Sequence, residues 1–94
     1  MKILWTRLAI ADMDAAHDHI AEENPSAAAG VLERIKKSVA MLLRHPRLGR
    51  AGRVVGTREL VVSGTPFVIP YRIKTGRIEI LAVIHSARSW PESL

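Results

Sequence analysis

The sequence contains no cysteine, and this absence excludes several classes of protein at once. Without cysteine there is no disulfide framework, no thiolate nucleophile and no zinc or iron–sulfur site with sulfur ligands. No run approaches the about 18 to 20 apolar residues that a membrane-spanning helix needs. Residues 1–5 continue directly into Thr6 and Arg7, without the apolar stretch and cleavage site of a secretory signal. We therefore expect a cytoplasmic protein that does not associate with a membrane.

The sequence motifs of nucleotide, hydrolase and metalloprotease chemistry are missing as well. No glycine-rich phosphate loop follows a strand, and neither a Gly-x-Ser-x-Gly elbow nor a His-Glu-x-x-His pair occurs. His17 and His19 are two positions apart on an expected helix and point to different sides, so they cannot share a metal ion. A length of 94 residues predicts a single domain over residues 1–94, too small for a deep active site. We expect no cofactor, no metal and no small-molecule substrate.

The charge of the chain is positive and unevenly distributed. The formal net charge is +5, and residues 1–43 carry five Lys/Arg against six Asp/Glu, whereas residues 44–94 carry nine against three. A positive surface attracts nucleic acid or an acidic protein and accelerates the encounter with either. The sign alone does not choose between these partners, and a surface that only improves solubility is a third interpretation.

Two helices are predicted after a short strand at residues 2–5. Apolar residues at helical spacing predict one helix over residues 7–23, capped by Thr6, and a second over residues 25–44 with Pro25 in its first turn. The second helix has an expected buried stripe of Ala28, Val31, Leu32, Ile35, Val39, Leu42 and Leu43. The short link between these two helices predicts an antiparallel hairpin that buries its apolar face against another element.

The rest of the chain alternates apolar and polar residues, which predicts three antiparallel strands in one sheet and an α+β fold. After a Gly- and Arg-rich loop, the strands are expected at residues 57–62, 66–73 and 77–85, and the turns between them at residues 63–64 and 74–76. The rows expected to pack on the helices are Phe67, Ile69, Tyr71, Ile73 and Ile78, Ile80, Ala82, Ile84. Pro70 has no N–H for a ladder, so an edge or a bulge is expected there.

Arginines and one histidine are concentrated in the sheet half of the chain. They are Arg50 and Arg53 in the loop, Arg58, Arg72 and Arg77 in the strands, and His85 at the end of the last strand. By alternation Arg72 and His85 should both lie on the face away from the helices, whereas the face of Arg58 stays open. If these three converge, they form a cationic groove for phosphate oxygens with His85 as acid or base. The alternative is that the arginines are solvated and pair with Glu59 or Glu79.

Six short motifs, in order along nearly the whole chain, resemble the RelE/ParE superfamily of toxins from type II toxin–antitoxin modules. They are Trp5-Thr6 leading to Ala9 and Asp12, Asn24-Pro25 with Ala28, Pro46-x-x-Gly49-Arg50, Gly56-Thr57-Arg58-Glu59-Leu60, Tyr71-Arg72-Ile73, and His85-x-Ala87-Arg88-x-Trp90-Pro91. The resemblance implies a strand, a helix hairpin and a three-stranded sheet. It also implies a cognate antitoxin, whose C-terminal segment wraps across the helices and sheet and blocks the working surface.

The RelE branch of the superfamily cuts messenger RNA in the ribosomal A site. Arg58 and His85 match catalytic positions of some members of this branch, and Arg50 and Arg53 could stand in for basic residues of the preceding loop. However, no carboxylate lies between residues 33 and 59 to act as a base, and a serine follows His85 where the nuclease branch often ends in a tyrosine. The catalytic set therefore resembles an incomplete RelE site.

The ParE branch is similar in fold and is described as poisoning DNA gyrase. The C-terminal motif and the Gly56–Leu60 motif resemble this branch more closely, so we favour a gyrase poison over an endoribonuclease that acts on ribosome-bound messenger RNA. In this interpretation the target-binding residues are Arg50, Arg53, Arg58, Arg72, Arg88 and Trp90, since Arg and Trp are common anchors of protein contacts. Trp90 could instead fold back and cover the sheet edge. A general nucleic-acid-binding domain is the third hypothesis.

Overall fold

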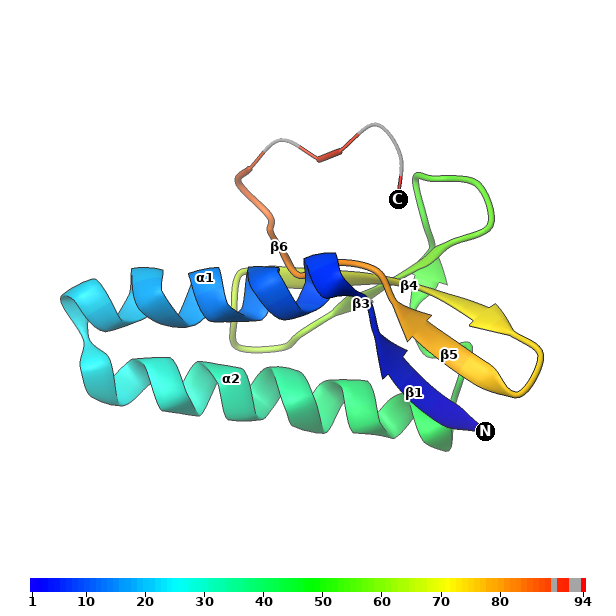
Figure 1. The fold of residues 1–94 in the computed structure, drawn as a ribbon, viewed down its shortest axis with the longest axis horizontal. Helices are drawn as coiled ribbons and strands as arrows, with labels where there is room; N and C mark the ends of the chain where they lie inside the picture. Colours follow the sequence, from blue (N-terminus) through cyan, green and yellow to red (C-terminus); the bar gives the residue numbers. More distant parts are fainter. Residues whose placement is uncertain (89, 92–93) are drawn as a thin grey trace.

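Two helices pack on one face of a mixed β-sheet (Figure 1). The computed structural model describes residues 1–88, 90–91 and 94. Figure 1 shows α1 and α2 as antiparallel neighbours, with part of the sheet behind them and strands β1 and β5 extending past the end of the hairpin where α1 begins. The predicted α+β class and helix hairpin are confirmed. In the part of the chain that is described, no helix combines the length and the apolar character needed to cross a membrane.

The helices begin where side-chain caps satisfy free backbone N–H groups. Helix α1 (Arg7–Glu23) starts after Thr6, whose Oγ1 accepts from Ala9 N at 3.1 Å. Helix α2 (Pro25–Ala40) starts after Asn24, whose Oδ1 accepts from Ala27 N at 3.2 Å. The second helix was predicted to continue to residue 44, but its last turn is the 3₁₀ segment η1 (Met41–Leu43).

The 3₁₀ turn changes which leucine enters the core. In this tighter helix residues three apart lie on one line, so Leu42 follows Val39 into the core and is fully buried. Leu43 is 49% exposed, and its prediction as a buried residue was wrong. Val31 and Leu32 are partly buried and pack against the core as expected.

The sheet contains more strands than the sequence predicted. The strands are β1 (Lys2–Trp5), β2 (Arg50–Ala51), β3 (Arg58–Val61), β4 (Phe67–Lys74), β5 (Arg77–Ile80) and β6 (Ile84–His85). Their order is β1-β5-β4-β3-β2, with β6 also pairing with β4. β1 runs parallel to β5, and all the other pairs are antiparallel. The two predicted hairpin turns are present, and each has a glycine at positive φ, Gly64 and Gly76.

The predicted strand over residues 77–85 is broken into two, and Pro70 explains the break. Tyr71 pairs with Ile80, the last residue of β5. Leu81 N then donates to Pro70 O at 2.9 Å, but proline has no N–H to complete the pair. Residues 81–83 leave the ladder, and pairing with β4 resumes only at β6. The expected irregularity at Pro70 is therefore found inside the sheet, on the central strand β4.

This break reverses the faces that alternation assigned to the last strand. Ile84 pairs with Val68, and His85 pairs with Phe67. Because paired residues in a sheet point to the same side, His85 lies on the helix-facing side and Ile84 on the opposite one. The prediction that Ile84 packs on the helices and that His85 points away with Arg72 was wrong.

The core lies between the helices and the inner row of β4 and β5. This row was predicted correctly at Phe67, Ile69, Tyr71, Ile78 and Ile80, all at most 5% exposed, with Ile73 partly buried. From the helices Ala9, Met13, Ile35, Val39 and Leu42 pack against it. Each fully buried isoleucine contributes about 1.5–3 kcal/mol through the removal of apolar surface from water. The opposite face of the sheet, which we call the outer face, is not covered by the helices.

Candidate functional site

The outer face carries two clusters in which one carboxylate binds two arginines. In the first cluster Arg50 is the strand partner of Glu59, and its Nε and Nη2 donate to Glu59 Oε1 at 3.3 and 3.2 Å. Arg53 donates to Glu59 Oε2 from both its backbone N, at 2.8 Å, and its Nε, at 3.2 Å. Glu59 is only 3% exposed, whereas both arginine side chains are more than half exposed.

The second cluster lies two strands away on the same face. Arg72 is the strand partner of Glu79 and donates from Nε to Glu79 Oε1 at 2.7 Å. Arg77, two residues before Glu79, donates from Nε to the other carboxylate oxygen, also at 2.7 Å. Both arginine side chains are more exposed than Glu79, at 36% and 42% against 16%. The ion pairs with Glu59 and Glu79 that the sequence offered as an alternative are thus present.

The arginines keep both carboxylates ionised. Burial raises the pKa of Glu59, but the hydrogen bonds from the Arg53 backbone and from the Arg53 and Arg50 side chains outweigh it and lower the pKa below 4.5. Hydrogen bonds from Arg72 and then Arg77 lower the pKa of Glu79 in the same way. Each cluster therefore carries two positive charges and one negative charge at neutral pH.

We expect the first cluster to make the protein less stable in acid. A carboxylate with a lowered pKa in the folded state contributes stability above its unfolded pKa, near 4.5, and this contribution is lost as pH falls through the folded pKa. The difference in unfolding free energy between the wild type and Glu59→Gln should therefore shrink between neutral pH and pH values well below 4.5. Urea denaturation across this range measures it, with Glu33→Gln on the exposed side of α2 as control. A difference that stays constant with pH would contradict the expectation.

Residues 86–88 and 90–91, which we call the returning chain, follow β6, and Trp90 among them contacts the first cluster. The Arg53 guanidinium carbon lies 3.6 Å from the centre of the Trp90 ring, a close cation–π contact. Trp90 is half-buried. The sequence offered Trp90 either as an interface residue or as one that folds back on the sheet, and the structure places it folded back beside a candidate target-binding arginine.

Arg58 supports a loop instead of joining the outer face. It pairs with Tyr71 and so points to the helix side, which settles the face that the sequence left open. Its Nε donates to Gly49 O at 2.9 Å and its Nη2 to Arg47 O at 3.2 Å. Tyr71 Oη reaches the same loop, because it donates to Pro46 O at 2.7 Å and accepts from Gly49 N at 2.8 Å. The loop that leads into β2 and Arg50 is therefore held by hydrogen bonds from side chains on β3 and β4.

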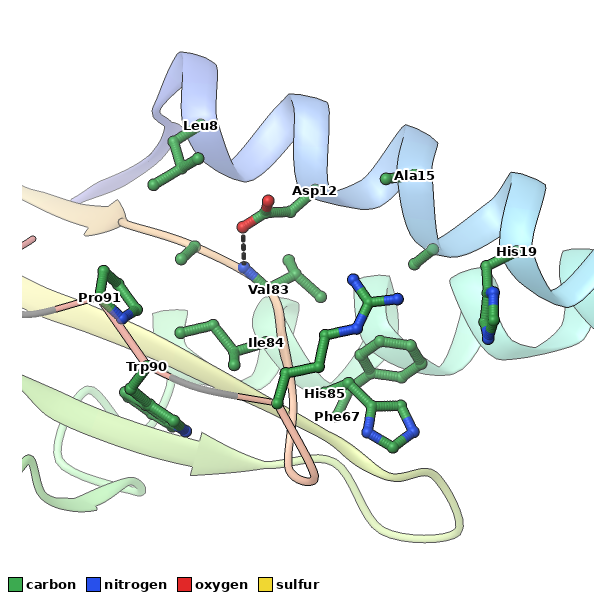
Figure 2. A pocket seen from close by; sticks show the side chains of 13 residues that line it. Leu8, Asp12, Ala15, His19, Phe67, Val83, Ile84, His85, Trp90 and Pro91 are labelled. Carbon is green, nitrogen blue, oxygen red and sulfur yellow. Dashed lines mark hydrogen bonds between the residues drawn. The ribbon is translucent and has the colours of Figure 1, made fainter.

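His85 lies in a groove of about 400 Å³ between α1, β6 and the returning chain (Figure 2). Its ring meets Phe67 edge to face, with 5.6 Å between the ring centres, and its Nδ1 accepts from Ala87 N at 3.1 Å. Figure 2 shows Asp12 reaching from α1 to Val83, whose backbone N donates to Asp12 Oδ2 at 2.9 Å. Arg88 also lines this groove.

The structure separates the residues that the sequence grouped. Arg50, Arg53 and Arg72 belong to the outer face, and Arg58 points to the helix side. Trp90 contacts Arg53 and also lines the groove that holds His85 and Arg88. The expected convergence of Arg58, Arg72 and His85 does not occur.

Sequence reasoning missed Asp12 and Thr6 as the residues that hold the break in the sheet. Thr6 Oγ1 donates to Leu81 O at 3.0 Å, and Asp12 binds Val83 N on the same segment. The available signal was their spacing, since the N-cap Thr6 and the α1 residues Ala9 and Asp12 follow at steps of three, and neighbours three apart share a helix face.

Comparison with known families identifies the chain. The model of the family described as ParE toxin of type II toxin-antitoxin system, parDE, matches residues 3–90. The chain belongs to the ParE toxin family. It is 42% identical over 93 residues to Y4kP of Sinorhizobium fredii, described as a candidate toxin, covering 99% of this chain and 96% of the relative. Toxin RelE2 of Caulobacter vibrioides is 36% identical over 87 residues, covering 93% and 97%.

Solved structures agree with this ParE assignment. A chain of the chromosomal ParDE TA system from P. aeruginosa has a TM-score of 0.84 and 34% identity, with 90% of this chain and 95% of that chain covered. The YoeB/ParE toxin from Agrobacterium tumefaciens has a TM-score of 0.63 at 18% identity, over 90% and 98%, and shares the fold. The protein is thus a toxin of a type II toxin–antitoxin module, and membership in the ParE family implies a cognate antitoxin as its partner.

Proposed function

We propose that this ParE toxin inhibits bacterial growth by binding and poisoning DNA gyrase. The observation that carries the proposal is the separation of His85 from Arg72 on opposite faces of the sheet. A phosphodiester-cleaving site needs its acid or base within hydrogen-bond reach of the groups that bind the phosphate. Arg58, the other catalytic candidate, donates to loop carbonyls. This arrangement favours a protein that acts by binding.

The proposed gyrase-binding surface is the outer face with the returning chain. Arg50, Arg53, Arg72 and Trp90 present exposed guanidinium groups and a half-buried indole there, and Arg and Trp are enriched among residues that dominate protein interfaces. We propose that the cognate antitoxin neutralises the toxin by covering this face. The antitoxin and the target would then exclude each other.

Pulse labelling after induced expression without antitoxin tests the proposal. Thymidine incorporation should fall within minutes and before methionine incorporation, because gyrase poisoning stops DNA synthesis first. Purified toxin should also inhibit supercoiling by gyrase in vitro. An earlier fall in methionine incorporation would replace the proposal with RelE-like cleavage of messenger RNA on the ribosome.

We expect His85→Gln to leave toxicity within about twofold of the wild type, whereas loss of a general acid or base costs about 100-fold or more. Glutamine keeps a side-chain acceptor for Ala87 N but cannot titrate. The measurement is the inducer concentration that halves the growth rate, at matched protein levels. Arg72→Gln is the comparison, because it removes a charge from the proposed binding surface and should reduce toxicity. A non-toxic but folded His85→Gln protein would contradict the gyrase proposal.

A further inference from the structure

The outer face concentrates the positive charge of the molecule. Strand register and ion pairs place six cationic side chains on it, Lys2, Arg50, Arg53, Arg72, Lys74 and Arg77. The carboxylates paired with them are Glu59 and Glu79. The cations exceed these two carboxylates by four, compared with a formal net charge of +5 for the whole chain.

A ligand approaching this face meets guanidinium groups, because the carboxylates lie beneath them. Glu59 and Glu79 are 3% and 16% exposed, whereas the four arginine side chains are 36% to 58% exposed. Arg50 and Arg53 each use two of the five side-chain N–H groups of an arginine on Glu59. Arg72 uses one on Glu79. The remaining N–H groups are oriented by the carboxylates and available to an anion.

The two clusters are spaced for an extended anion. Glu59 lies opposite Pro70 and Glu79 opposite Arg72, so the clusters are two strands and two residues apart. With strands about 4.8 Å apart and residues about 3.4 Å apart, this corresponds to roughly 12 Å. A single phosphate cannot bridge this distance, whereas the phosphates along one strand of a duplex recur every ~3.4 Å of helix axis.

The distribution of exposed apolar residues favours a nucleic acid as a further ligand of this face, beside the protein contact proposed above. Protein interfaces have an apolar centre and a polar rim. Among the exposed residues of the outer face this order is reversed, since Arg72 lies on the central strand β4, whereas Val68 and Pro70 in the same row are buried. Its exposed apolar residues, Leu4 on β1 and Val61 on β3, lie toward the two sides of the sheet.

The aromatic residues favour a duplex over a single strand. Single-stranded nucleic acids bind through bases stacked on aromatic side chains. Phe67 and Tyr71 are buried, Trp5 packs against the core, and the Trp90 ring is stacked with Arg53. These are all four Phe, Trp and Tyr residues of the chain. We propose that the outer face binds the phosphate backbone of double-stranded DNA without reading its sequence, whatever enzyme the toxin poisons.

The test is the binding of the full-length toxin to a fluorescent duplex of mixed sequence, about 20 base pairs long, followed by anisotropy between ~50 and ~200 mM salt. Four phosphate contacts predict that the logarithm of the association constant falls with that of salt with a slope of about −3.6. The variant Arg50→Gln/Arg72→Gln, which removes one arginine from each cluster, should reduce the magnitude of the slope by about two and weaken binding on the order of tenfold.

The control is Lys36→Gln/Lys37→Gln, which removes the same charge from exposed positions of α2 and should change the affinity less than about twofold. Thermal unfolding of both variants checks that they are folded. An equal loss of duplex affinity in both variants would show that only the net charge of the protein attracts the DNA, and it would overturn the proposal. The proposal would also be overturned if the toxin bound the duplex no more tightly than it binds polyglutamate, since that result would indicate an acidic protein partner. Gyrase inhibition without duplex binding would overturn this inference alone, and duplex binding without gyrase inhibition would overturn only the proposed target.

Discussion

Gly49→Ala should lower the free energy of unfolding by about 2 to 4 kcal/mol. A Cβ at this position would lie 2.6 Å from Tyr71 Cε1 and 2.8 Å from the Glu59 carbonyl oxygen. Neither neighbour can move easily, because Tyr71 is fully buried and the Glu59 backbone is paired in the sheet on both sides. Close packing makes such an overpacked site costly. Urea denaturation with linear extrapolation measures the change.

Gly30→Ala is the matched control for this substitution. Gly30 lies within α2, and among the described residues no atom outside its own helix backbone and chain neighbours is within 4 Å of the position that its Cβ would take. The same replacement should therefore stabilise the protein by about 0.5 to 1 kcal/mol, because alanine favours a helix over glycine. Equal effects of the two substitutions would show that the close approach at Gly49 does not limit stability.

Tyr71→Phe should lower the free energy of unfolding by about 2 to 3 kcal/mol. The hydroxyl donates to Pro46 O and accepts from Gly49 N, and Gly49 is buried. Phenylalanine would leave that N–H without its partner and would lose the second hydrogen bond, although the ring would still fill the core. A change below about 0.5 kcal/mol would mean that water replaces the hydroxyl.

The two sites should be coupled. In Gly49→Ala/Tyr71→Leu the ring atoms that meet the new Cβ are absent, so the double variant should be more stable than the sum of the single changes predicts. The clash with the Glu59 carbonyl persists, so the relief is partial. Additive effects would locate the strain at Glu59 alone.

Local patterns were enough to predict the helices, the hairpin turns and the inner row of the sheet. Helical spacing on α1 and α2, the caps at Thr6 and Asn24, and alternation along β4 each act over a few residues. The two-residue strand β2 was missed because Arg50 and Ala51 carry no alternation of their own. Their pairing depends on β3, whose partner residues Glu59 and Arg58 lie nine and seven positions further along the chain.

The position of His85 could not be obtained by counting along the strand. Pro70 predicted an irregularity, but alternation was extended through residues 77–85 as if the strand were continuous. The three residues after Ile80 leave the ladder, and the alternation of faces begins again, with the opposite assignment, at Ile84. The site prediction failed at this point, because one uncounted break moves every later side chain to the other face.

The face and contacts of Arg58 depended on long-range pairing in the same way. In the sequence Arg58 shares a row with Leu60 and Val62, and nothing local orients that row. The register with Tyr71 orients it, and the loop carbonyls then take the guanidinium. The motif that joins Gly49 to Arg50 can now be understood as a support for the first arginine cluster.

The first strand of the chain finds its pairing partner near the C-terminal end of the sequence. Within the described residues β1 pairs only with β5, and Thr6 donates to Leu81 O, 75 positions further along. A ribosome adds about 5–20 residues per second, so for several seconds a growing chain has its helices but not its finished sheet. The outer face, with Glu79 and the arginines that it holds, forms only as synthesis ends. We therefore expect the proposed binding surface to be absent from the growing chain, so that an antitoxin can meet it as soon as it forms.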